Sequence, residues 1–227
     1  MIKDTLALYL FFFTLSILLA IIPSLDIAAS NLFYYGNGQF LVKHYLVGKE
    51  YFYEFLIRRI GIPFVVLFLL FFPILLIFFP VLQKNFKTFL IKKTDIGFIW
   101  LSAILLSFFI NSILKETWGR ARPNDILEFG GEKFFSSWVQ ISSECLGNCS
   151  FVSGDSSVGF FIASFYYITK EKKFLYFSLV AGLVFGFIRI GAGAHFLSDI
   201  LMSFVIVNLS LNIIHIVYYN LLKWIKA

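Results

Sequence analysis

The amino-acid sequence predicts an all-α membrane protein, with six spanning helices in a single domain of residues 1–227. Of these residues 59% are hydrophobic and only 14% are charged, which is more apolar surface than a soluble domain can bury. Several apolar runs reach or approach the ~20 residues that a helix needs to cross a bilayer. These runs do not alternate as barrel strands do, and a helix satisfies its own backbone hydrogen bonds in lipid.

Six apolar runs are expected to form the helices, and no internal repeat or linker marks a second domain. They are residues 5–22, 60–82, 96–114, 151–169, 174–189 and 200–222. The first run has two interpretations: an uncleaved helix, which its length favours, or a signal peptide cleaved near SLDIAAS. Cleavage would leave the orientation of the other five helices unchanged.

The distribution of lysines predicts which side faces the cytoplasm. Placing both termini and loops 83–95 and 170–173 on one side gathers ten lysines there, against three acidic residues. The positive-inside rule then makes both termini cytoplasmic. All five arginines fall on the opposite side, and the planar guanidinium suits phosphate recognition better than an ammonium does.

Cys145 and Cys149 lie in an outer loop with the sequence CLGNC. In an oxidising compartment they are candidates for a disulfide, and two free thiols are the alternative. A metal site is not expected, because two cysteines without a nearby histidine provide too few ligands.

The outer segment KETWGRARP directly follows the third apolar run. If the helix continues through it, Lys115 and Arg122 are separated by close to two turns and share one face. Pro123 then ends the helix and favours an extended Arg122. The alternative is a cluster of positive charge that only stops translocation. Such a cluster belongs on the cytoplasmic side, whereas this end of the helix is expected to face outward.

Two further outer segments carry polar residues at helix starts. In CSFVSGDSSVGF, Ser153 and Asp155 are good capping residues, and the free N–H groups of a helix start can hold an anion. In RIGAGAHFLSD, His195 and Asp199 share a helix face, so the carboxylate can orient the imidazole as in a catalytic triad. Structural roles, a simple cap and a buried histidine, are the alternatives.

Together these segments resemble the three-part signature of the type 2 phosphatidic acid phosphatase superfamily. The matching pattern is Lys115-x6-Arg122-Pro123, Ser153-Gly154 and Arg189-x5-His195-x3-Asp199, within residues 96–200. The resemblance implies metal-independent, cofactor-free phosphate ester hydrolysis through a phosphohistidine. His195 would be the nucleophile and Asp199 its orienting partner, with phosphate held by Lys115, Arg122, Ser153, Gly154 and Arg189, and Arg120 in support.

The second motif departs from the family, because Asp155 stands where a proton-donating histidine is common. Aspartate is normally ionised at neutral pH, so Asp155 is an awkward general acid and could instead position a water or hold Arg120. The surrounding pattern CxxxCSFVSGD nevertheless resembles that of bacterial lipid A phosphatases of the inner membrane. Among these, the resemblance is greatest to the lipid A 4′-phosphatases. Lipid A 1-phosphatases, undecaprenyl pyrophosphate or phosphatidylglycerophosphate phosphatases and an inactive lipid-binding member remain alternatives.

The resemblance thus implies a lipid substrate, a site at the periplasmic edge of the bilayer and no nucleic acid. A channel or transporter is a different class, which would place ionisable residues along a path within the spans. The expected spans carry almost no charge, and His215 is the notable exception.

Overall fold

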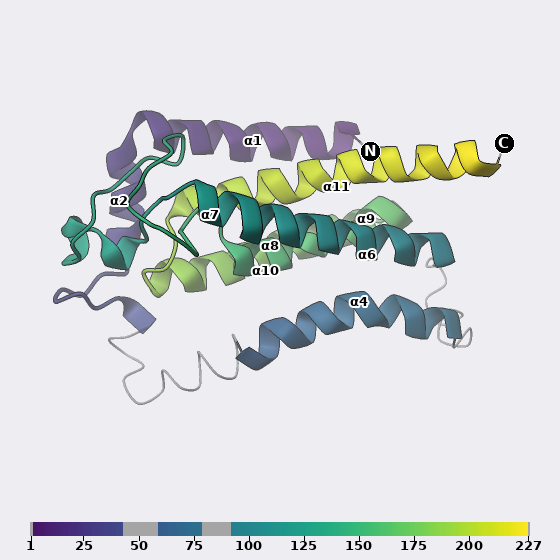
Figure 1. The fold of residues 1–227 in the computed structure, drawn as a ribbon, viewed down its shortest axis with the longest axis horizontal. Coiled ribbons are helices and arrows are strands. Elements are labelled where there is room, and N and C mark those ends of the chain that lie inside the picture. The colour runs from purple at the N-terminus through teal and green to yellow at the C-terminus, as the bar shows by residue number, and fades with distance from the viewer. Residues whose placement is uncertain (1, 43–58, 79–91, 227) are drawn as a thin grey trace.

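The structure is a computed structural model that describes residues 2–42, 59–78 and 92–226. Within these ranges the chain is helical and contains no strand beyond two isolated bridges, which confirms the all-α prediction for this part of the chain. The longer helices lie along one axis and form an elongated bundle (Figure 1). They are α1 (Ile2–Ile21), α4 (Ile62–Phe78), α6 (Lys93–Phe108), α10 (Lys172–Gly191) and α11 (Leu197–Lys226).

Three helices in the described ranges are long and apolar enough to cross a membrane: Lys93–Thr117, Lys172–Gly191 and Leu197–Ile225. A fourth span results if α1 and α2 (Pro23–Asn31), which meet at 98°, count as one broken segment. A shorter apolar helix, Arg59–Phe72, covers the start of the expected span 60–82, of which residues 79–82 lie outside the described ranges.

The expected fourth span, residues 151–169, is not one continuous helix. Ser153 caps α8 (Gly154–Phe161), so residues 151–153 precede the helix instead of forming its first turn. At Ile162 and Ala163 the backbone tightens to bonds with residues three positions back, and α9 (Ser164–Thr169) follows. This prediction was therefore wrong in detail: a capping residue starts the helix late, and a tight turn interrupts it.

The short helix α8 packs closely against α10 at a pair of glycines. A Cβ atom on Gly159 would lie 2.5 Å from the backbone nitrogen of Gly182, so only glycine allows this approach. The contact holds the second half of α8 against the middle of α10.

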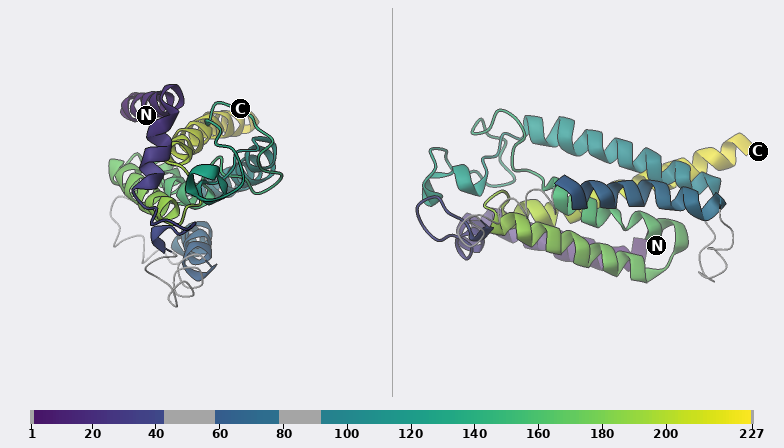
Figure 2. Two further views of the ribbon diagram at one scale, coloured as in Figure 1. Left: turned by 90° about the vertical axis from the view of Figure 1, so that its left-hand side faces the viewer. Right: turned by 90° about the horizontal axis from the view of Figure 1, so that it is seen from below.

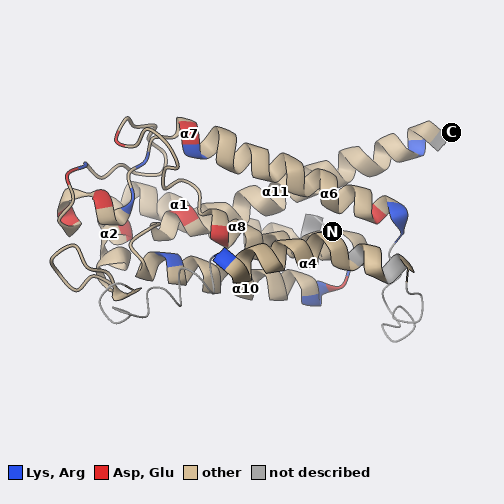
Figure 3. Ribbon diagram, turned by 60° about the horizontal axis from the view of Figure 1, so that its bottom comes forward, with Lys and Arg blue, Asp and Glu red and all other residues tan. Residues whose placement is uncertain are grey.

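The two termini lie toward the same end of the bundle (Figure 1). The lysine-bearing ends of α6, α10 and α11 lie at this end as well, as Figure 3 shows by charge. At the opposite end α2 crosses the bundle, and the loops that follow α7 (Lys115–Thr117) gather beside it (Figure 2). The three polar segments of the sequence are therefore collected at one end, away from most of the lysines.

Candidate active site

The third helix continues past the expected end at residue 114 but stops at Thr117, before Arg122, and this changes how Lys115 and Arg122 meet. A π-helical segment, η2 (Phe109–Leu114), and α7 complete this helix, and Gly119 then turns the chain with φ +65°. Arg122 is extended, as predicted, and Pro123 begins the short 3-10 helix η3 (Pro123–Asp125). The shared helix face was therefore a wrong expectation, because the chain leaves the helix at Gly119.

Asn148 brings the two cations together instead. Lys115 Nζ lies 3.5 Å from the side-chain oxygen of Asn148, and Arg122 Nη2 donates to the Asn148 backbone carbonyl at 2.7 Å. The backbone N–H of Asn148 in turn donates to Glu116 at 3.1 Å. A single loop residue thus links the cations at both ends of the first motif.

The loop that presents Asn148 is closed by a disulfide. Cys145 and Cys149 are bonded, with their Cα atoms 5.6 Å apart. The buried Cys149 also donates its backbone N–H to the Lys115 carbonyl at 3.1 Å. This hydrogen bond fastens the loop, which the bridge closes, to the start of α7.

The N-terminus of α8 forms a second side of the site. Ser153 is the N-cap, and its hydroxyl accepts from the Ser156 backbone N–H at 3.4 Å. A Cβ atom added to Gly154 would lie 3.4 Å from Lys115 Nζ, so the lysine lies directly against this helix start. A helix N-terminus and an ammonium group side by side favour an anion at this position.

His195 lies in the turn between α10 and α11 and is 2% exposed. Its Nδ1 donates to the backbone carbonyl of Ser150 at 2.7 Å and lies 3.8 Å from Asp199 Oδ2. The direct His–Asp hydrogen bond expected from the sequence is thus replaced by a bond to Ser150, with Asp199 behind it. Because a carbonyl only accepts, Nδ1 carries the proton and Nε2 has the lone pair.

Burial lowers the pKa of His195 to about 4, and the Asp199 carboxylate opposes this effect. The positive charges of Lys115 and Arg189 lower the pKa further. The imidazole is therefore neutral at neutral pH, which is the state in which Nε2 can act as a nucleophile.

Arg120, expected in a supporting role, contacts the carboxylates of Asp199 and Asp26. It is fully buried, with Nη1 2.6 Å from Asp199 Oδ1 and Nη2 2.7 Å from Asp26 Oδ2. Burial alone would lower its pKa, but the two carboxylates outweigh this and raise it. Removing one partner from a buried ion pair typically costs about 3–5 kcal/mol, so the cluster holds the end of the bundle together.

Asp155 pairs with Arg189, and not with Arg120 as one expectation had it. The Arg189 Nε atom lies 3.2 Å from Asp155 Oδ2, and the arginine side chain is almost buried. This pair connects the first turn of α8 to the last turn of α10. Asp155 therefore lies beside the expected phosphate ligands and holds one of them in place.

Three functional candidates were missed by the sequence interpretation: Asp26, Ser150 and Asn148. Ser150 and Asn148 stand beside Cys149, so a search of the residues next to the cysteines would have found them. Asp26 carried a weaker signal, as an acidic residue four positions after the first apolar run. Nothing in the sequence indicated that it meets Arg120.

Basic side chains from three separate segments around a buried neutral imidazole are typical of an enzyme that transfers a phosphoryl group. A family model described as the PAP2 superfamily matches residues 97–223, and the chain belongs to this superfamily. The match confirms the family predicted from the three motifs.

Curated relatives are similar to about half of this chain. A lipid A 4′-phosphatase of Francisella tularensis subsp. novicida (strain U112) is 36% identical over 126 residues, 54% of this chain and 55% of that protein. A lipid A 4′-phosphatase of Rhizobium leguminosarum is 32% identical over 114 residues, 49% of this chain and 48% of that protein. The chain thus spans about half the length of the curated relatives it matches, and no solved structure matches it.

Proposed function

We propose that this chain is a metal-independent lipid phosphatase that works through a phosphohistidine on His195. The observation that carries the proposal is the His195 ring itself. Its Nδ1 is held by the Ser150 carbonyl at 2.7 Å, which leaves Nε2 as the basic nitrogen, and its low pKa keeps that nitrogen unprotonated.

The reaction proceeds in two displacements at phosphorus. Nε2 of His195 attacks and forms a P–N bond, while the P–O bond to the lipid breaks and the leaving oxygen takes up a proton. Water then attacks the phosphohistidine, loses a proton and breaks the P–N bond, which releases phosphate. Lys115, Arg122, Arg189 and the start of α8 hold the spread negative charge of both transition states.

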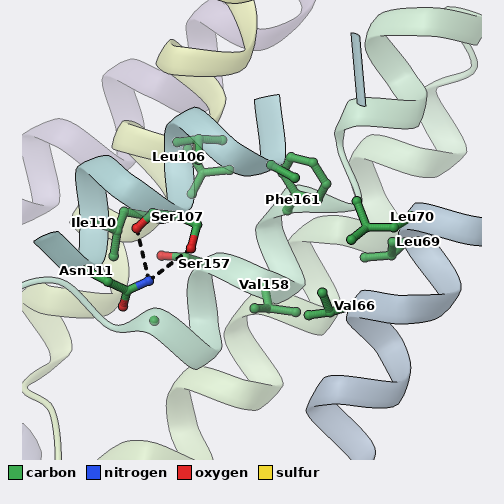
Figure 4. Close-up of a pocket in the computed structure, with 13 residues that line it drawn as sticks. Val66, Leu69, Leu70, Leu106, Ser107, Ile110, Asn111, Ser157, Val158 and Phe161 are labelled. Carbon is green, nitrogen blue, oxygen red and sulfur yellow. Dashed lines mark hydrogen bonds between the residues drawn. The ribbon is translucent and has the colours of Figure 1, made fainter. Parts of the chain in front are cut away.

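The substrate we propose is the 4′-phosphate of lipid A, since relatives of that name share 32–36% identity with this chain. A lipid substrate also fits the surroundings of the site. A cavity of about 150 Å³ borders Gly154 and Asn111 and continues between α4, α6 and α8 (Figure 4). Its wall is mainly aliphatic, with Val66, Leu69 and Leu106, so it offers space for an apolar chain beside the phosphate site.

We place the site at the periplasmic face of a bacterial inner membrane, with both termini in the cytoplasm. The lysine count supports this orientation, and the two termini lie at the end of the bundle opposite the site (Figure 1). The disulfide of the CLGNC loop also suits an oxidising compartment.

The pairing of Asp155 with Arg189 favours a second candidate. A carboxyl group that already holds a neighbouring arginine is less available to the leaving oxygen, and a sugar hydroxyl at the 4′ position is a poor leaving group. The 1-phosphate of lipid A or a polyprenyl pyrophosphate leaves more easily and needs less help from an acid. Phosphatidylglycerophosphate and an inactive lipid-binding protein are the remaining alternatives to be tested.

Mass spectrometry of lipid A decides between these functions. The chain is expressed in a host whose lipid A carries both phosphates, with the His195→Ala variant as the control. Loss of one phosphate, mapped to the 4′ position by fragmentation, is the expected result. Loss at the 1 position selects the lipid A form of the second candidate. Unchanged lipid A in cells that contain folded protein contradicts a lipid A phosphatase and leaves the polyprenyl pyrophosphate, phosphatidylglycerophosphate and lipid-binding alternatives.

A further inference from the structure

Asp26 lies far from the three motifs in sequence, yet its carboxylate is buried among their residues. Its Oδ1 accepts the backbone N–H of Ser198 at 3.0 Å, at the start of α11. Its Oδ2 accepts from Arg120 Nη2 at 2.7 Å and from the hydroxyl of Ser198. The side chain is 1% exposed, and its carboxylate contacts Ser198 and Arg120.

A continuous series of buried hydrogen bonds leads from Asp26 to His195. Arg120 Nη1 donates to Asp199 Oδ1 at 2.6 Å, and the Ser150 hydroxyl donates to Asp199 Oδ2 at 2.6 Å. The Ser150 carbonyl then accepts from His195 Nδ1 at 2.7 Å. Ser150 is also tied to Arg120 through its backbone N–H, which donates to the Arg120 carbonyl at 2.9 Å.

The charges of this series do not cancel. Two carboxylates and one guanidinium give −1 − 1 + 1 = −1 for Asp26, Asp199 and Arg120. Because Arg120 shares its charge between both partners, Asp199 keeps a net negative charge beside the imidazole. An imidazole that becomes cationic on phosphorylation is stabilised by such a charge, as in other triads.

We infer that Asp26 is a positioning residue for the reaction, acting on His195 through Arg120 and Asp199. The inference rests on the proposed function of His195 as nucleophile. It gives α2, the segment that turns by 98° across the end of the bundle, a part in the active site (Figure 2). The role of Asp26 is to hold Arg120 where it orients the Asp199 carboxylate without neutralising the charge of that carboxylate.

The test is Asp26→Asn, assayed as full-length protein in detergent with an aryl phosphate. Asparagine keeps the size of the side chain and leaves Arg120 and Asp199 as a neutral pair, so the variant is expected to fold. We expect kcat to fall by about tenfold or more, as for loss of an orienting charge. KM and inhibition by inorganic phosphate should change by less than about twofold, because Asp26 does not touch the substrate.

Asp95→Asn is the matched control, because Asp95 is another buried carboxylate at a helix start. It accepts from the Lys92 backbone N–H at 2.8 Å and from the Tyr219 hydroxyl at 2.5 Å, at the opposite end of the bundle. Its kcat should stay at the wild-type level. An equal loss in both variants would mean that any buried carboxylate matters, and it would overturn the inference.

A double-mutant cycle separates positioning from general structural damage. If Asp26 acts through Asp199, adding Asp26→Asn to Asp199→Asn should cost little further activity. Fully additive losses, or a wild-type kcat in Asp26→Asn, would overturn the inference. Wild-type protein without activity, or an active His195→Ala variant, would instead contradict the proposed function.

Ser198→Ala replaces Asp26→Asn if the latter does not fold. Arg120 Nη1 donates to the Ser198 hydroxyl at 2.8 Å, and this hydroxyl donates to Asp26, so the change loosens the same link without altering charge. The expected result is a smaller fall in kcat with KM unchanged. A wild-type kcat in Ser198→Ala would then overturn the inference.

Discussion

The backbone carbonyl of Ser150 lies 2.7 Å from Nδ1 of His195, closer than the Asp199 carboxylate at 3.8 Å. The orienting bond to the imidazole thus comes from the main chain next to the disulfide. Asp199 acts from behind, through the Ser150 hydroxyl at 2.6 Å. Substitutions of His195, Ser150 and Asp199 are therefore expected to affect catalysis to different extents.

Replacement of His195 by alanine should abolish turnover, because none of the other site residues described above provides its basic nitrogen.

Asp199→Asn should reduce kcat on the order of a thousandfold, since it removes the charge that stabilises the cationic ring. Ser150→Ala should be milder than Asp199→Asn, because the carbonyl that holds the ring remains. Steady-state kinetics with an aryl phosphate measures all three, and residual activity in His195→Ala above a small fraction of wild type would exclude the phosphohistidine.

Asp155→Asn tests whether Asp155 provides the proton for the leaving group. If it does, a sugar phosphate should lose far more rate than an aryl phosphate, whose leaving group needs little protonation. The ion pair with Arg189 at 3.2 Å supports the rival role, in which Asp155 positions a phosphate ligand. Rate losses of equal size for both substrates would assign it that positioning role.

Breaking the Cys145–Cys149 bridge should weaken phosphate binding more than chemistry. The bridge fastens Asn148, which contacts both Lys115 and Arg122, whereas His195 is held from Ser150. The double variant Cys145→Ser/Cys149→Ser should therefore show a severalfold higher KM with a smaller change in kcat. Treatment of the wild-type protein with a reductant should reproduce the effect, and an unchanged KM in both experiments would contradict it.

Folding stability should fall as the pH drops from about 6.5 toward about 4. The pKa of His195 is lowered to about 4 by burial, whereas in the unfolded chain it is about 6.5. The unfolded state therefore binds more protons in this window, and stability is lost as the pH decreases. Thermal unfolding in detergent at several pH values measures this, with His195→Ala as the control that should show a smaller loss.

Activity should persist in excess EDTA, because cationic side chains provide the charge stabilisation that a metal gives elsewhere. The part of the chain that the structure describes has no group of three His, Cys, Asp or Glu side chains arranged to hold a metal ion. Activity that disappears with chelator and returns with Mg²⁺ would contradict this prediction. The assay needs the wild-type protein alone.

The sequence by itself determined the helical class, the superfamily and the residues of the three motifs. Apolar runs of this length predict helices, because in lipid the backbone must form its hydrogen bonds within the same segment. Motif residues such as His195 and Asp199 could be recognised because they stand close together in the sequence, although His195 precedes α11 and does not share a helix face with Asp199 as expected. The lysine positions likewise predicted that the termini and the lysine-rich loops share one end, and the described helix ends agree (Figure 3).

Only the tertiary structure decided which of these residues touch. Arg120 and Arg122 stand two positions apart and looked alike in sequence, yet one is buried between Asp26 and Asp199 and the other binds Asn148. The turn at Gly119 makes this difference, because it takes the chain out of the helix and sends the two side chains to different partners. The contact between Asp26 in α2 and Arg120 depends on how distant parts of the chain pack, and no local pattern encodes it.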